Sequence, residues 1–180
     1  MLKPHATPPG SGDRVARRFN GKDRNIVQDL GGGPAHHVRT MTVAEFDTKV
    51  AIVVRDDLAA WQRLNVTAFL MSGLVASAGA AAIGEDYVDG DGVRYLPLLV
   101  QPVLVFETGS EKLRRLRERA ARREVPVAIY TADMFVTGND ADNRAAVRAV
   151  ATEQLDLVGI GIRAGHRDVD AIVRGTRRHP

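Results

Sequence analysis

A charged triplet stands where a buried strand is predicted to end. Arg55, Asp56 and Asp57 directly follow Val50–Val54, an unbroken apolar run of strand length. A carboxylate at such a place can act as a general base toward water, and an arginine can donate hydrogen bonds to a developing oxyanion. The triplet is therefore suited to binding a polar ligand or to hydrolysing an ester or amide, with Asp57 as the candidate catalytic base.

Further polar residues are predicted to join this triplet at one edge of a sheet. In open α/β sheets, ligands bind in the crevice beyond the carboxyl ends of the strands. Segments far apart in the sequence supply polar groups to that edge, which favours a shared site. The candidate ligand-binding residues are Arg55, Asp56, Asp57, Asn65, Tyr130, Thr131, Thr137 and Asn139.

A purely structural role is the competing interpretation of the same side chains. Asp and Asn are favoured helix caps, so Asp57 is also a candidate cap for the helix that follows it. Asn65 and Thr67 can likewise satisfy backbone groups nearby. For each residue taken alone, both interpretations stay open.

Strand-like and helix-like segments alternate along the chain, which is typical of a layered α/β domain. A second apolar run, Leu64–Val75, is apolar nearly all round and predicts a helix that is buried on all sides. Gly159 and Gly161 lie inside the last predicted strand, where glycine marks a bulge or the close approach of another backbone or a ligand. The predicted strands are Val50–Val54, Val103–Phe106, Val125–Tyr130 and Leu155–Ile162.

Two stretches stand outside this alternation. Residues 85–95 carry two Asp-Gly pairs between β-forming residues, a pattern that predicts a β-hairpin. Residues 1–46 are rich in proline and glycine and have sparse, aperiodic apolar residues, so they predict a disordered extension. The folded domain is then expected to comprise residues 47–180.

The composition excludes several kinds of chemistry. The 180 residues include no cysteine, so disulfides, thiolate metal sites and cysteine nucleophiles are excluded. The net charge of +3 permits contact with nucleic acid without implying it. No run is long and apolar enough to span a membrane, and a cytoplasmic location is expected. No pattern calls for a metal or another cofactor, and none is expected.

Several of these segments resemble known families. The segment Val54-Arg55-Asp56-Asp57-Leu58 resembles the V-R-x-D-L signature that closes the first strand of type II peptidyl-tRNA hydrolases. Three later segments, Gln101–Phe106, Val127–Thr131 and Val158–Gly161, match in the same order. The amino-acid sequence of Asp57–Leu70 is more similar still to a sister family, catalogued as domain of unknown function two thousand. The resemblance covers residues 47–180 and places them in the type II peptidyl-tRNA hydrolase-like superfamily.

The resemblance implies a three-layer α/β/α sandwich on a mixed sheet of about four strands. The hydrolases cleave the ester between peptide and tRNA with a lysine and a histidine on the helix after the first strand. Arg63-Leu64-Asn65 stands in place of the lysine, and Met71-Ser72 in place of the histidine.

Without the usual hydrolase residues, the expected function is binding of a small or nucleotide-like ligand at the strand-end edge of the sheet. The alternative is a hydrolase of an ester or amide, such as peptidyl-tRNA, that uses Asp57 as its base. Transfer RNA is a less favoured partner than a small molecule, and a homodimer is left open.

Overall fold

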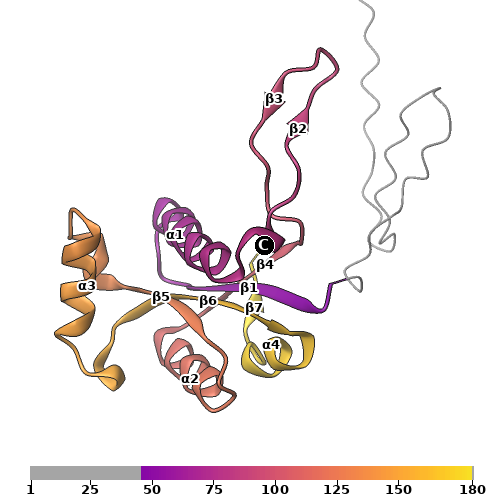
Figure 1. Cartoon of the computed structure of the whole chain (residues 1–180). Helices are drawn as coiled ribbons and strands as arrows, with labels where there is room; N and C mark the ends of the chain where they lie inside the picture. The colour runs from indigo at the N-terminus through magenta and orange to yellow at the C-terminus, as the bar shows by residue number, and fades with distance from the viewer. Residues whose placement is uncertain (1–45, 180) are drawn as a thin grey trace, which may run out of the picture. The chain divides into compact units, whose positions relative to one another are not determined.

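The protein is an α/β domain built on a five-stranded mixed sheet, with a separate two-stranded hairpin (Figure 1). The computed structural model describes residues 46–179, so the predicted extension lies outside the described residues except for Phe46. The strands are β1 (Thr48–Arg55), β2 (Tyr87–Val88), β3 (Arg94–Tyr95), β4 (Val103–Thr108), β5 (Val127–Thr131), β6 (Leu157–Gly165) and β7 (Arg177–Arg178). The helices are α1 (Ala60–Ala78), α2 (Ser110–Ala121), α3 (Asp140–Arg148) and α4 (His166–Ile172), with the 3₁₀ turns η2 (Ala80–Ala82), η3 (Ala132–Phe135) and η4 (Thr152–Gln154).

Strand β1 is the central strand of the sheet, whose order is β5-β6-β1-β4-β7. It pairs in parallel with β4 and antiparallel with β6, which confirms the predicted mixed α/β sheet. The sheet has five strands rather than about four, because Arg177–Arg178 pairs with the outer edge of β4. Two residues carry no periodic pattern, so this fifth strand left no signal in the sequence.

Alternate residues of β1 pack in two separate hydrophobic cores, one on each face of the sheet. Val50, Ile52 and Val54 pack in the core beneath α1, whereas Ala51 and Val53 pack in the core against α2 and α4. All five side chains are almost completely buried, as the unbroken apolar run predicted. Figure 1 shows α1 on one side of the sheet and α2 with α4 on the other.

Helix α1 is buried on one side only, so the prediction of a helix buried all round is wrong. Val66, Leu70 and Leu74 face the sheet and are buried. Leu64 is 74% exposed and Phe69 is 53% exposed, because no other described element covers the outer side of this helix. No helix within residues 46–179 is long and apolar enough to cross a membrane.

The two glycines of β6 allow α1 to lie close against the sheet, which confirms the predicted close approach. A Cβ atom added at Gly159 would lie 2.4 Å from Cγ1 of Val66, and one at Gly161 would lie 3.2 Å from Cδ1 of Leu74. Since Val66 is β-branched and fully buried, it has little freedom to move aside. The glycines therefore set the height of α1 above the strands.

The Asp-Gly-rich segment forms the predicted hairpin. Strands β2 and β3 pair with each other in register Tyr87 with Tyr95, and a bridge between Ile83 and Leu99 closes the base. The hairpin projects away from the sheet on the side that carries α1 (Figure 1).

Replacing Gly159 by alanine is expected to destabilise the domain by about 1–3 kcal/mol, because the added methyl group overpacks the contact with Val66. The measurement is the free energy of unfolding from urea titration. Gly138→Ala is the matched control, since a Cβ at Gly138 meets nothing within 4 Å. Equal stability of the two variants would show that α1 can shift without cost.

Candidate functional site

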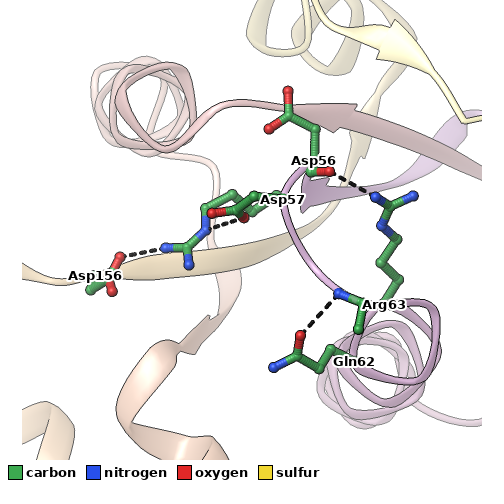
Figure 2. A network of polar contacts seen from close by, with 7 residues as sticks. Asp56, Asp57, Gln62, Arg63 and Asp156 are labelled. Carbon is green, nitrogen blue, oxygen red and sulfur yellow. Dashed lines mark hydrogen bonds and ion pairs between the residues drawn. The ribbon is translucent and has the colours of Figure 1, made fainter.

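Arg55, the first residue of the charged triplet at the end of β1, pairs with two carboxylates of the protein. Nε of Arg55 donates to Oδ1 of Asp57 at 2.6 Å, and Nη1 donates to Oδ1 of Asp156 at 2.6 Å (Figure 2). Partial burial disfavours the charge on Arg55, but the hydrogen bonds and charges of both carboxylates outweigh it and raise the arginine's pKa. Asp57 is therefore held by Arg55, and the alternative interpretation that it caps α1 is wrong. The N-cap position of that helix is Ala59.

A buried carboxylate that the sequence did not reveal lies beside this triplet. Glu107, near the end of β4, is 4% exposed and accepts a hydrogen bond from Nε of Arg177 at 2.7 Å. Nη1 of Arg63 lies 3.6 Å from the same carboxylate, and Nη2 of Arg63 donates to the backbone oxygen of Asp56 at 2.7 Å (Figure 2). This network joins the start of α1 to β4 and β7, so it positions the loop that carries Asp56 and Asp57.

A pocket lies at the strand-end edge of the sheet, between the first half of α1, the end of β5 and the start of α3. We call it the edge pocket; its volume is about 380 Å³. It is lined by Trp61, Asn65, Phe69, Tyr130, Met134, Phe135, Thr137, Gly138, Asn139, Asp140 and Asn143.

Four aromatic rings form one continuous wall of the edge pocket. The ring centroids of Trp61 and Phe135 are 5.8 Å apart, those of Phe135 and Tyr130 are 5.2 Å apart, and those of Tyr130 and Phe69 are 5.7 Å apart. The first and last pairs meet edge to face, an arrangement that the quadrupoles of aromatic rings favour. Trp61 is 62% exposed and Phe69 is 53% exposed, so both side chains keep apolar surface that a bound molecule could cover.

Uncharged polar groups stand beside this wall. The hydroxyl of Tyr130 lies 3.3 Å from Oδ1 of Asn65, and burial raises the pKa of this phenol, so it stays a donor at neutral pH. The hydroxyl of Thr137 contacts the backbone oxygen of Met134 at 3.1 Å and also contacts the amide of Asn143. Because a hydroxyl has one proton, it cannot donate to both, and an Asn143 amide that donates through Nδ2 would satisfy the geometry.

The structure divides the predicted site residues into two groups and one buried residue. Four of them, Asn65, Tyr130, Thr137 and Asn139, line the edge pocket. The triplet at 55–57 forms the separate charged cluster and does not line that pocket. Thr131 is fully buried at the end of β5, and its hydroxyl has no hydrogen-bond partner among the described residues.

Several pocket residues were not predicted from the sequence. Trp61 and Phe69 are among them, and together with the predicted Asn65 they follow one another at intervals of four, the spacing that aligns side chains on one face of a helix. That spacing is the signal which could have grouped them. Phe135 and Asn143 carry no such pattern, because η3 and α3 are short and bury none of their residues.

These features define a mixed α/β domain with a pocket at the strand-end edge of its sheet. The chain belongs to the family described as "Protein of unknown function (DUF2000)", whose model matches residues 48–180. A solved structure of a protein of unknown function from Agrobacterium tumefaciens strain C58 is similar, with a TM-score of 0.73 and 46% sequence identity. The similarity covers 75% of this chain and 99% of that one. No curated protein matches the sequence significantly.

Replacing Glu107 by alanine is expected to lower the free energy of unfolding by roughly 2 kcal/mol or more, since it leaves the partly buried Arg63 without a carboxylate. Glu118→Ala is the control, because Glu118 pairs with Arg122 at the surface of α2 and its loss should change stability by less than about 0.5 kcal/mol. Thermal and urea unfolding of both variants provide the measurement. Similar losses in the two variants would contradict the role given to Glu107.

Proposed function

We propose that the edge pocket binds a small, planar, polar molecule of the size of a nucleobase or nucleoside. The observation that carries this proposal is the aromatic wall of Trp61, Phe135, Tyr130 and Phe69 with amide side chains beside it. Aromatic faces stack on planar ring systems of any base, and amides pair with their donor and acceptor edges.

The size and charge of the pocket support the same ligand class. A volume near 380 Å³ lies within the roughly 300–1,000 Å³ of small-molecule sites. Asp140 is the one charged residue among those that line the edge pocket, and Nη2 of Arg144 pairs with it at 2.6 Å. The pocket therefore presents little net charge, which favours an uncharged ring over a carboxylate or an amine.

An adjoining pocket offers a place for a phosphate. It has a volume of about 480 Å³ and shares Phe69, Tyr130, Met134, Asp140 and Asn143 with the edge pocket. Arg144 and Arg148 of α3 also line it, and Arg144 pairs with Asp140. A nucleoside monophosphate with its base against the aromatic wall could place its phosphate toward these arginines, so the proposal extends to nucleotides.

We infer that the domain is a three-layer α/β/α sandwich of the type II peptidyl-tRNA hydrolase-like superfamily, in a cytosolic protein. The V-R-x-D-L-like segment at the end of β1 and the helices on both faces of the sheet support the superfamily. The complete lack of cysteine is compatible with a reducing compartment.

The hydrolase alternative has weaker support from the geometry. Asp57 lines neither of the two pockets, and one of its oxygens accepts a hydrogen bond from Arg55. Arg63, at the place of the hydrolase lysine, contacts Glu107 and the backbone of Asp56, and an arginine stays charged in proteins, so it cannot shuttle a proton.

Transfer RNA is likewise the less favoured partner. The arginines of α2 would be its natural contacts, but Arg115 and Arg122 pair with Glu111 and Glu118 one helical turn away. Arg119 donates to two backbone oxygens at the end of α4. Much of this basic helix is thus engaged within the protein.

Titration with nucleosides and nucleoside monophosphates tests the proposal through the fluorescence of Trp61, the single tryptophan of the chain. At least one compound is expected to change the emission saturably, with the strongest binding for the base whose edge matches the amides. Asn65→Leu is expected to weaken that binding roughly tenfold or more, because the buried edge of the ligand loses its partner.

Ser77→Ala is the matched control, since Ser77 lies exposed on the same helix and lines neither pocket. Asp57→Asn should also leave the affinity unchanged. If no nucleoside or nucleotide bound, or if Asn65→Leu bound as well as the unaltered protein, the ligand class would be wrong.

Peptidyl-tRNA hydrolysis is expected to be at least about a hundredfold below that of a true hydrolase, because general acid–base assistance from the lysine and histidine is missing. The assay is release of tRNA from an N-blocked aminoacyl-tRNA by the purified protein. Robust turnover that Asp57→Asn abolishes would establish the hydrolase alternative instead.

A further inference from the structure

Residues Gly84–Val100, which we call the arm, form a well-defined element that projects from the domain (Figure 1). Its turn is held by Asp89, whose Oδ1 accepts from the backbone N–H groups of Asp91 at 3.0 Å and Val93 at 2.9 Å. The hydroxyl of Tyr95 donates to the other oxygen of Asp89 at 2.8 Å. Its two strands pair only with each other, and an isolated two-stranded hairpin is at best marginally stable in water.

The arm exposes an unusual amount of apolar surface for its length. Leu96 is 85% exposed and Leu98 is 62% exposed. Seven of its large apolar side chains are each at least 42% exposed. The side chains concerned are Tyr87, Val88, Val93, Tyr95, Leu96, Leu98 and Val100.

A second apolar surface lies on the same side of the sheet, over β4. Helix α1 packs over β6, β5 and β1, so Val103 and Val105 of β4 are only partly covered although they face its core. With the exposed Leu64 they line a pocket of about 340 Å³, to which Arg63 and Arg178 also contribute. We call this surface the β4 face.

The charges of these two surfaces are complementary. The arm carries Glu85, Asp86, Asp89 and Asp91 against the single base Arg94. Of the two arginines that line the pocket of the β4 face, Arg63 contacts Glu107, whereas Arg178 is exposed. Complementary charges favour one orientation of two partners and suppress others.

We propose that two copies of this chain form a symmetric dimer in which the arm of each copy lies across the β4 face of the other. The arm and the face stand on the same side of one chain, so a single two-fold axis can bring both contacts together, and the assembly closes at two copies. In a monomer, the apolar outer side of α1 around Leu64 is exposed to water. In the dimer, the arm of the second copy covers it.

The first test is the oligomeric state of the full chain at micromolar concentration, by light scattering after gel filtration. A dimer is expected, and the double substitution Leu96→Asp with Leu98→Asp is expected to raise its dissociation constant by roughly a hundredfold or more, because the charges enter an apolar contact. Leu64→Asp on the β4 face should have the same effect. Val136→Asp is the control, since Val136 is 89% exposed but lies outside both surfaces.

The second test identifies which surfaces meet, and the chain suits it because it has no cysteine. Leu64→Cys and Leu96→Cys are prepared separately, mixed, and treated with a short bismaleimide cross-linker. Cross-links between one Leu64→Cys chain and one Leu96→Cys chain are expected to outnumber cross-links between two copies of the same variant. Circular dichroism melting verifies that each variant is folded, as the exposure of these residues predicts.

A monomer at these concentrations would overturn the proposal. A dimer unaffected by the arm substitutions would do so as well. Cross-links formed by Leu96→Cys alone, and not with Leu64→Cys, would show that arms contact arms and that the β4 face is not the docking surface.

Discussion

Val50–Val54 must be buried on both faces, and most of the domain follows from this one requirement. Each face of β1 needs its own apolar cover, which α1 provides on one side and α2 with α4 on the other. The parallel pairing with β4 and the antiparallel pairing with β6 bring the carboxyl ends of β1, β4 and β5 to one edge. Because α1 begins directly beyond that edge, the polar loop and the edge pocket form there.

Charged and uncharged polar groups at this edge have different roles because burial affects them differently. A partly buried charge is costly unless an opposite charge satisfies it, and Arg55, Arg63 and Glu107 each have such a partner. These residues hold the loop and the start of α1 in place. Amide and hydroxyl groups tolerate partial burial against aromatic rings, so Asn65 and Thr137 can face a ligand.

The two faces of the sheet are covered unequally, and the proposed dimer rests on this asymmetry. One helix covers the face that carries the arm, whereas two helices cover the other. Part of β4 and the outer side of α1 consequently keep apolar side chains exposed to water. The arm beside them also exposes apolar side chains. The proposed dimer would cover both surfaces with one symmetric contact.

The sequence by itself determined the alternation of strands and helices, the double burial of β1, the hairpin and the close approach at Gly159 and Gly161. Each of these is a local property, because periodicity and glycine placement report the demands of a single segment. Only the tertiary structure decided that α1 is exposed on one side and that Glu107 is buried. It also separated the 55–57 cluster from the edge pocket. The contacts responsible join residues 65 and 70 positions apart, as between Tyr130 and Asn65 or Arg177 and Glu107, and no local pattern encodes such a pairing.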